Sequence, residues 1–201
     1  EISECLVGSE MCIRDRTMSS TFQIEHNRLF GELREVLKTD IARITGKANG
    51  GRSILFVYPP EDDDAYIAYA RENFNSDEYS FIDLRTLFTE FVSEQGIEQF
   101  QENYKEFGNE VFFSDNFYEE TFFYYIIKAI ENSYQMNKIP VLVHTGAIYG
   151  MGFSNINIME HRIVMSAQLP LIAFYPATVD KDNINFLGKQ IASKYRCIVI
   201  K

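Results

Sequence analysis

The chain has 201 residues, of which 29 are acidic and 19 basic, and it carries a formal net charge of −10. Such an acidic chain repels phosphate backbones at long range, which argues against direct binding of DNA or RNA by this chain alone. Its longest apolar runs fall far short of the roughly 20 residues that a membrane-spanning helix needs, so we also expect no membrane association.

The first 17 residues, EISECLVGSEMCIRDRT, differ from the rest of the chain. They show neither helical nor strand periodicity and lack the basic and apolar regions of a secretory signal, and they directly precede Met18, which could start a reading frame. The string also resembles translated read-through of a sequencing adapter. We therefore treat 1–17 as a non-native leader, with a disordered native arm as the alternative, and expect a single domain over 18–201.

Cysteine usage points to a reducing compartment once the leader is set aside. Cys5 and Cys12 belong to the leader, which leaves Cys197 as the one cysteine of the domain. A lone cysteine cannot form a disulfide framework or a cysteine-based zinc cluster. We therefore expect a soluble protein of the cytoplasm.

Helices are expected where apolar residues recur at three- and four-residue spacing. The stretches with this pattern are 22–45, 85–95, 97–107, 117–136, 156–168 and 180–195. A further helix is expected to open with the acids at 61–64 and to run through Ala65, Ile67, Ala68 and Ala70. Gly46 is expected to end the first of them. Its apolar stripe is expected to cover the sheet, with docking on a partner protein as the alternative. The many aromatic side chains likewise predict an extensive core or, alternatively, a partner surface.

Strands are expected where short apolar runs are bounded by Pro, Gly or Asn. These runs are Ile54–Tyr58, Tyr79–Leu84, Val141–Val143, Pro170–Pro176 and Cys197–Ile200. The run Val141–Val143, which is followed by a glycine-rich loop, is predicted to be the central strand. Continuous apolar runs are typical of strands covered on both faces. Their alternation with helices predicts a three-layer α/β fold, with a mostly parallel sheet of about five strands and helices on both faces.

The predicted sheet offers one candidate ligand site. In open parallel sheets, ligands bind outside the carboxyl ends of the strands. The residues that this rule gathers at one edge are Tyr58, Glu61, Asp83, His144, Thr145, Gly146, Tyr175 and Pro176. Asp83 is expected to cap the following helix or, alternatively, to point into the crevice. His144 is expected to be structural, because no nucleophile or orienting carboxylate lies beside it in sequence.

No complete catalytic or metal-binding motif accompanies this edge. The four acids at 61–64 could hold magnesium, but carboxylates in a first helical turn also offset the helix macrodipole, and we adopt that simpler explanation. The glycine-rich loop is not a P-loop, and Asn155 stands where the third glycine of G-x-G-x-x-G would be. There is no G-x-S-x-G turn and no H-x-x-x-H pair. We therefore expect no catalytic residues, no metal and no cofactor.

Short motifs at the strand ends carry a resemblance to a known family. In chain order they are YPPE (Tyr58–Glu61), IDL (Ile82–Leu84), HTGAIYGM (His144–Met151), PLIAFYP (Pro170–Pro176), Asp180, FLG (Phe186–Gly188) and YR (Tyr195, Arg196). Through the order and spacing of these motifs, nearly all of 19–201 resembles the BrxB family of bacterial BREX phage-exclusion systems, most strongly from Ile139 onwards. One difference lies before the first strand, where that family usually has a G-L-G-N-E-type sequence and this chain has GKANGGR.

The resemblance implies a small cytoplasmic component of a multigene anti-phage system. Such a component acts beside a methyltransferase, an ATPase and PglZ, an alkaline-phosphatase-like protein, and the family brings no established catalytic residues with it. We therefore expect a non-enzymatic subunit that works by protein–protein assembly with the PglZ-like protein and other BREX components. A degenerate nucleotide-binding or hydrolytic α/β protein, with its site at the carboxyl edge, is the alternative.

Overall fold

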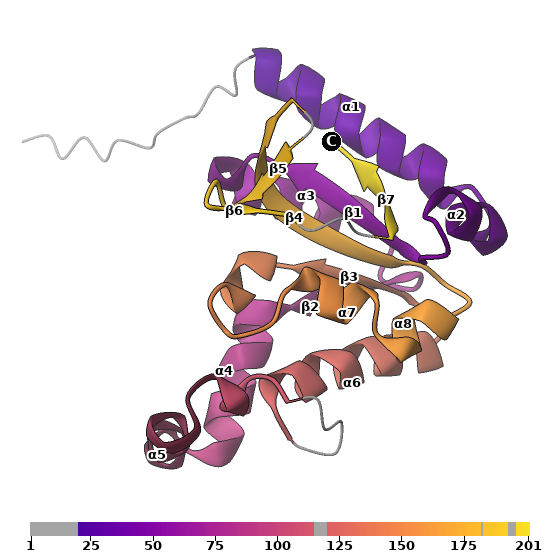
Figure 1. Ribbon diagram of the computed structural model, residues 1–201. Helices are drawn as coiled ribbons and strands as arrows, with labels where there is room; N and C mark the ends of the chain where they lie inside the picture. Colours follow the sequence, from indigo (N-terminus) through magenta and orange to yellow (C-terminus); the bar gives the residue numbers. More distant parts are fainter. Residues whose placement is uncertain (1–19, 115–119, 182, 193–195) are drawn as a thin grey trace, which may run out of the picture.

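The computed structural model describes residues 20–114, 120–181, 183–192 and 196–201, so the leader 1–17 lies outside the described residues. A mostly parallel sheet forms the middle layer (Figure 1). Its five parallel strands lie in the order β2 (Tyr79–Asp83), β3 (Ile139–Val143), β4 (Leu171–Asp180), β1 (Ser53–Tyr58) and β7 (Cys197–Ile200). Two short strands, β5 (Asn183–Phe186) and β6 (Gln190–Ile191), continue antiparallel from the end of β4.

This architecture confirms the predicted fold class. The runs Ile54–Tyr58, Val141–Val143 and Leu171–Phe174 lie in interior strands with parallel neighbours on both sides, as predicted. The strand taken as central, however, is not in the middle. That place belongs to β4, which lies between β3 and β1.

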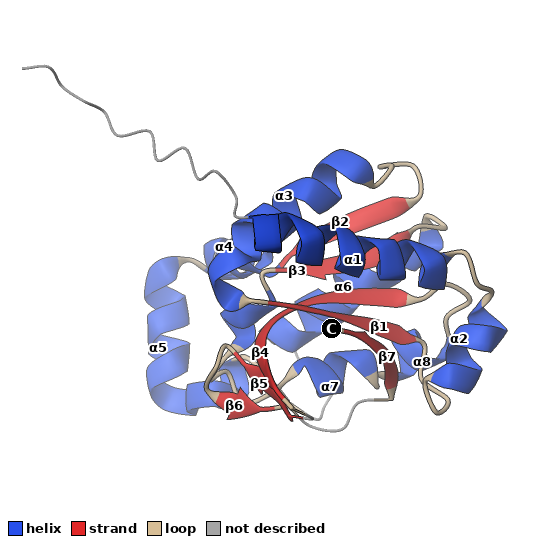
Figure 2. Ribbon diagram, turned by 90° about the horizontal axis from the view of Figure 1, so that it is seen from above, coloured by secondary structure: helices blue, strands red, loops and turns tan. Residues whose placement is uncertain are grey.

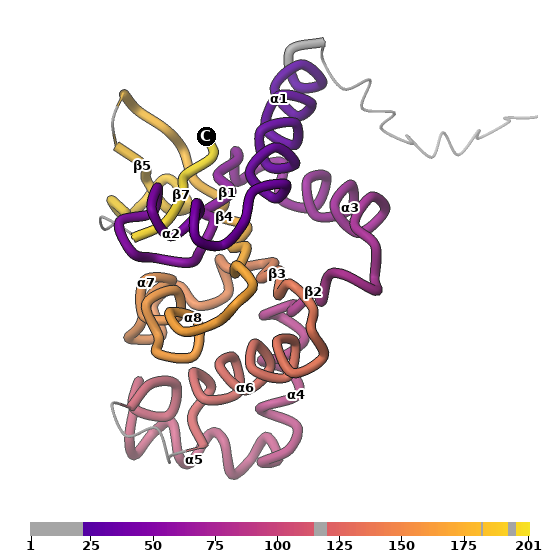
Figure 3. Tube along the Cα trace, turned by 90° about the vertical axis from the view of Figure 1, so that its right-hand side faces the viewer, coloured from indigo at the N-terminus to yellow at the C-terminus, as the bar shows by residue number. Residues whose placement is uncertain are grey.

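Helices cover both faces of the sheet (Figures 2 and 3). One face carries α1 (Ser20–Leu37) and α3 (Asp63–Asn73). The other carries α4 (Leu84–Gln95), α6 (Phe122–Gln135), α7 (Asn155–Met159) and α8 (Arg162–Ser166). Along β1 the side chains alternate between these layers: Phe56 packs with Phe30 of α1, whereas Leu55 belongs to the core under α6. All six residues of β1 are therefore buried.

The first predicted helix is two helices. It breaks after α1, and Asp40 caps α2 (Ile41–Lys47) by accepting a hydrogen bond from the backbone N–H of Arg43 at 2.8 Å. Gly46 therefore lies inside α2 and does not end the helix, contrary to the prediction. The α1 stripe packs on the sheet, as expected, since Leu29, Phe30 and Leu33 are buried in its core.

Two other predicted helices have different bounds. The stretch 156–168 is broken into α7 and α8, and the side chain of His161 accepts from the backbone N–H of Ile163 to cap α8. The helix predicted from 117 begins at Phe122 as α6, because Thr121 caps it by accepting from the N–H of Tyr124. Residues 117–119 lie outside the described residues.

The helix predicted over 180–195 is wrong. In its described part the chain forms the β5–β6 hairpin, and β4 runs on to Asp180 past the expected end at Pro176. Lys181 and Leu187 have positive φ angles of 53° and 52°, which reverse the chain direction and cannot continue a helix. The three- and four-residue spacing of the apolar residues in this segment therefore does not reflect a helix. Ile191, which was expected on the apolar side of that helix, is 68% exposed.

The remaining elements are short or peripheral. Three 3₁₀ turns, η1 (Pro60–Asp62), η2 (Gly108–Val111) and η3 (Thr145–Ile148), connect the larger elements. Helix α5 (Ile97–Phe107) lies at the end of α4, away from the sheet (Figure 1). Over the part of the chain that the structure describes, no helix has the length and apolar character to cross a membrane.

Candidate functional site

Parallel strands bring three polar residues to one edge of the sheet. Tyr58 ends β1, Asp83 ends β2 and His144 directly follows β3. The first turn of α3 adds Asp63 and Asp64 from the same edge. Arg85 pairs with both of these carboxylates, and together the six side chains form a continuous polar cluster, which we call the edge cluster.

Asp83 links β2 and β3 within the edge cluster. Its Oδ1 lies 2.9 Å from Nδ1 of His144, and the same oxygen accepts from the backbone N–H groups of Arg85 and Thr86 at 3.1 and 3.4 Å. Its Oδ2 accepts from the guanidinium of Arg71 at 3.2 Å. Of the two alternatives given for Asp83, the structure therefore shows the first, since Asp83 caps α4.

These contacts lower the pKa of Asp83. Partial burial acts to raise the pKa of the carboxyl group, but the hydrogen bond and charge of His144 and the backbone N–H donors outweigh it. Asp83 therefore stays an anion and holds the His144 ring by its Nδ1 atom. The other ring nitrogen, Nε2, lies 3.6 Å from Oδ1 of Asp64.

Tyr58 and Arg85 form the other half of the edge cluster. The hydroxyl of Tyr58 donates to Oδ1 of Asp63 at 2.6 Å, and the Arg85 guanidinium lies 3.5 Å from Oδ2 of the same carboxylate. Burial, and then the neighbouring charge of Asp63, raise the pKa of Tyr58 well above its ordinary value. Tyr58 is therefore a neutral hydrogen-bond donor that fixes Asp63.

The backbone at His144 has a left-handed conformation, with φ 53° and ψ 40°. This conformation is uncommon for a residue with a side chain and costs of order 1 kcal/mol or more. It is held on the following side by Thr145, whose buried hydroxyl donates to the carbonyl oxygen of Phe174 at 2.6 Å. Thr145 was a candidate ligand residue, but its hydroxyl is used inside the fold.

A cavity of about 390 Å³ adjoins the edge cluster. It is lined by Pro60, Glu61, Asp63, Asp64, Arg85, Gly146, Ala147, Pro176 and Leu187. The β5–β6 hairpin closes one side, because a Cβ atom at Gly146 would lie 3.2 Å from the Leu187 side chain. The volume is that of a small-molecule site, and charged groups of both signs line it.

Tyr175 does not join this site. Its ring is buried on the opposite face of the sheet, where it stacks on Phe186 with 4.6 Å between ring centroids. There it lines a second cavity of about 470 Å³ together with the glycine-rich loop at Gly150 and Gly152. No charged side chain is among the described residues that line this second cavity. The candidates from the sequence are therefore divided between two places.

Three members of the edge cluster could hold a divalent cation. One ligand atom each from Asp63, Asp64 and His144 lies within 4.8 Å of the other two, and Asp83 orients the imidazole from behind, as carboxylates do for metal-bound histidines. Arg85 opposes such a cation, because it already pairs with Asp63 and Asp64. The acids first considered for magnesium also included Glu61, which lines the neighbouring cavity but does not belong to this group.

Sequence reasoning missed the two arginines, Arg71 and Arg85. Arg85 comes two residues after Asp83, the cap of α4, so the sequence could predict that Arg85 lies in the first turn of that helix. Its ion pairs with α3 depend on how β1 and β2 are placed in the sheet, which the sequence pattern does not state. Arg71 at the end of α3 is brought to Asp83 in the same way.

Comparisons with known proteins add no relative. No protein-family model, no curated protein and no solved structure matches the chain.

Proposed function

We propose that this protein is a non-enzymatic subunit of a bacterial, cytoplasmic anti-phage system of the BREX type. It acts by assembly with a PglZ-like protein of alkaline-phosphatase fold and with other components of that system. The observation that carries the proposal is the ordered set of motifs that resemble the BrxB family. Each is short, and their order and spacing along the chain provide the specificity.

The positions of these motif residues agree with a shared structural purpose. Tyr58 from YPPE, Asp83 from IDL and His144 from HTGAIYGM belong to the edge cluster, which hydrogen bonds and ion pairs connect. Leu187 from FLG lies against Gly146 of the glycine-rich loop. These motifs therefore contribute side chains that stabilise the carboxyl edge of the sheet. A stable edge is compatible with an assembly subunit as well as with an enzyme.

The surface chemistry also favours a protein partner over nucleic acid. The chain is strongly acidic, and several large apolar side chains are exposed, among them Ile97, Tyr104 and Phe107. Aromatic residues anchor protein interfaces, whereas net negative charge opposes DNA.

The test is co-expression of this protein, carrying a tag, with the neighbouring genes, followed by size-exclusion chromatography at moderate salt. We expect a one-to-one complex with the PglZ-like protein. Elution of the tagged protein alone, together with a nuclease, phosphatase or nucleotide-hydrolysing activity that follows a change at the edge cluster, contradicts the proposal.

A second candidate function is nucleotide binding or hydrolysis at the carboxyl edge. The observation that favours it is the convergence of Asp63, Asp64 and His144 beside a cavity of about 390 Å³. Carboxylates and an oriented imidazole are ligands for the metal that accompanies a nucleotide phosphate.

Calorimetry with ATP, GTP or a dinucleotide in the presence of magnesium tests this candidate. A dissociation constant below about 100 μM, equivalent to more than about 5.5 kcal/mol, supports it if His144→Ala and Gly146→Val abolish the signal. Asp64→Asn should also abolish it, because the substitution removes one of the two carboxylates that would hold the metal. The Asp64 side chain is 91% exposed, so this variant should keep the fold. Asp77→Asn, at another exposed acid, is the matched control. Under the leading proposal no such binding occurs.

A further inference from the structure

The second cavity, of about 470 Å³, shares no lining residue with the edge cluster. Segments that are distant in sequence form its walls: the glycine-rich loop that leads into α7, the β5–β6 hairpin, and Asn109 of η2. Asn109 connects two of these walls, because its Nδ2 donates to the carbonyl oxygen of Gly150 at 3.2 Å.

Glycine is required where the loop passes this asparagine. Gly152 has a φ angle of 85°, a conformation that side chains disfavour, and a Cβ atom at this position would lie 3.3 Å from Cβ of Asn109. The loop and η2 therefore form a closely packed wall of the cavity.

The lining of the cavity is polar but uncharged. Four of the described lining residues carry a carboxamide group: Asn109, Asn155, Asn157 and Gln190. No described lining residue is charged, and the closest cation is beside the cavity, where the ammonium group of Lys189 lies 5.7 Å from the centre of the Tyr149 ring. A charged group inside the cavity would therefore lose its hydration without gaining an opposite charge, which is unfavourable. The lining favours an uncharged ligand.

Asn155 has a buried polar atom whose hydrogen-bonding capacity is unused. The residue is 2% exposed, and its Oδ1 has no hydrogen-bond partner among the described residues. A buried acceptor without a donor is unfavourable, so most such atoms in proteins are paired. The carboxamide carries both a donor and an acceptor, and turning its end exchanges their positions. A ligand with an N–H group at its edge would satisfy this amide.

Two exposed apolar side chains belong to different walls of the cavity. Tyr149 of the loop is 46% exposed, and Ile191 of the hairpin is 68% exposed. Aromatic side chains bind flat rings by stacking, and every nucleobase has a face that can stack. A planar ligand that covers Tyr149 and Ile191 would also remove their apolar surface from water.

We propose that the second cavity binds the uncharged base of a free nucleoside. The base would stack on Tyr149, and its edge would form hydrogen bonds with the carboxamide of Asn155. Adenine is the best match, because a carboxamide accepts from its N6 amine and donates to its N7 atom. The same base within a nucleic acid is a poorer ligand, since the net charge of −10 repels the phosphate backbone. The inference goes beyond the proposed assembly function and does not depend on it.

The test is calorimetry of the full chain with adenosine in the absence of magnesium. We expect a dissociation constant below about 1 mM. Inosine, which has a carbonyl group in place of the N6 amine, should bind at least about tenfold more weakly. AMP and a tetranucleotide of deoxyadenosine should bind no more tightly than adenosine. Glucose, which has no flat ring, should not bind.

Two variants test the residues that are assigned to the base. Asn155→Leu removes the carboxamide and should keep the fold, because its unpaired Oδ1 is lost without a hydrogen bond. Tyr149→Ala removes the stacking ring. Each should weaken adenosine binding at least about tenfold, whereas Tyr149→Phe, which keeps the ring, should bind as the parent chain does. Circular dichroism and thermal melting first establish that the variants fold.

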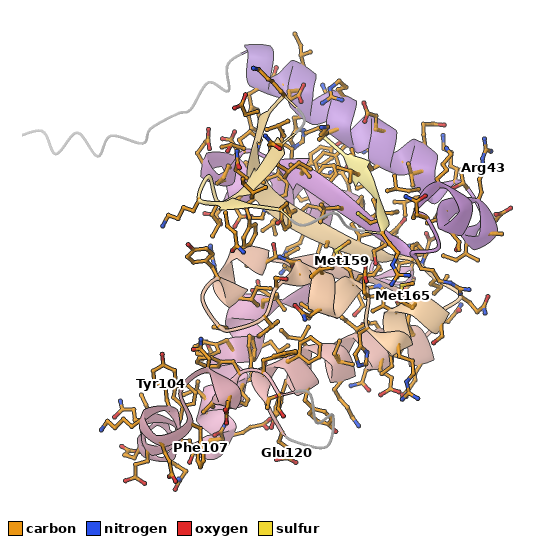
Figure 4. All side chains as sticks on the ribbon, viewed as in Figure 1. Arg43, Tyr104, Phe107, Glu120, Met159 and Met165 are labelled. Carbon is orange, nitrogen blue, oxygen red and sulfur yellow. The ribbon has the colours of Figure 1, made fainter. Side chains whose placement is uncertain are left out.

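Tyr104→Ala is the matched control. Tyr104 is also 46% exposed, and Figure 4 shows it on α5, outside the cavity lining. This variant should bind adenosine as the parent chain does. Asp64→Asn should also bind it normally, because Asp64 belongs to the carboxyl edge and not to the second cavity.

Several results would overturn the nucleoside site. One is the absence of adenosine binding by the parent chain, which leaves the cavity to water alone. Another is equal binding of inosine or glucose, or tighter binding of AMP or the tetranucleotide. Adenosine binding that Asp64→Asn abolishes, or that both Asn155→Leu and Tyr149→Ala leave unchanged, places the ligand elsewhere. None of these results bears on the complex with the PglZ-like protein, which the co-expression experiment measures separately.

Discussion

The imidazole of His144 lies 2.9 Å from the carboxylate of Asp83, a residue 61 positions earlier in the chain. The contact connects the carboxyl ends of two adjacent parallel strands, because Asp83 pairs with Val143 in the β2–β3 register and His144 follows directly. The same carboxylate caps α4. One side chain therefore fixes a strand end, a helix start and the orientation of the candidate ligand His144.

Substitutions of Asp83 should separate its two roles. Asparagine keeps the ability to cap α4 but loses the charge that His144 and Arg71 contact, so we expect Asp83→Asn to lower the free energy of unfolding by about 1 kcal/mol. Asp83→Ala removes the cap as well and should cost about 2 to 3 kcal/mol. Urea denaturation measures both. Equal losses in the two variants would show that the cap contributes nothing.

The low pKa of Asp83 also predicts a pH dependence. Because its folded-state pKa is below the ordinary carboxyl value, its contribution to stability is present above about pH 4 and is lost as the pH falls below that value. The difference in stability between the parent chain and Asp83→Asn should therefore shrink under acid. A difference that stays constant between pH 6 and the acid limit of folding contradicts this assignment.

His26 predicts pH dependence in a higher range. It is buried against the rings of Phe30, Tyr66 and Tyr69, and this burial lowers its pKa, although the charge of Asp62 acts in the opposite direction. The unfolded chain then binds the proton more readily, so stability is complete above about pH 6.5 and falls as the pH drops through that value. His26→Phe should flatten the stability profile below pH 6.5. Some slope should remain, since burial also lowers the pKa of His161.

Two glycines should respond to alanine in opposite directions. A Cβ atom at Gly51 would overlap the backbone carbonyl of Arg196, so Gly51→Ala requires a backbone shift and should destabilise the fold by about 2 kcal/mol or more. Gly31 lies in α1, and apart from the backbone of that helix and the neighbouring residues nothing lies within 4 Å of the added methyl group. Gly31→Ala should therefore stabilise the protein by about 0.5 to 1 kcal/mol. Thermal melts of both variants give the comparison.

Residues 1–17 should be dispensable for folding. Their sequence carries no apolar stripe that could pack on the domain. A chain that begins at Met18 should melt at the same temperature as the full chain. A fall of several degrees would show that the leader contributes to the folded domain.

The strands could be predicted from sequence because burial on both faces selects continuous apolar runs. The run Cys197–Ile200 is β7 residue for residue, and Ile54–Tyr58 lacks only Ser53 of β1. The breaks between helices were harder to predict from the sequence. The break after α1 depends on Asp40, a short polar residue whose capping competes with a helical pattern that continues through it.

The edge at which these residues lie could be predicted, but their contacts with one another could not. The rule for parallel sheets placed Tyr58, Asp83 and His144 at one edge, where the structure brings them together. It could not place Tyr175, because the alternation of side chains along β4 decides which face a residue occupies, and Tyr175 lies on the face opposite to Phe174. Nor could it find the His144–Asp83 pair, since that contact needs β2 and β3 to be neighbours.

The strand order has a consequence for the way the chain acquires its structure. β1 is the first strand to be synthesised, yet its neighbours are β4 and β7, with Ser53 opposite Leu171 and Cys197. The β2–β3 pair can form earlier at the far side of the sheet. During translation the apolar segment SILFVY therefore stays without a strand partner until most of the chain has left the ribosome. Such long-range pairing makes folding slow, and we expect this segment to be the part of the nascent chain that most needs a chaperone.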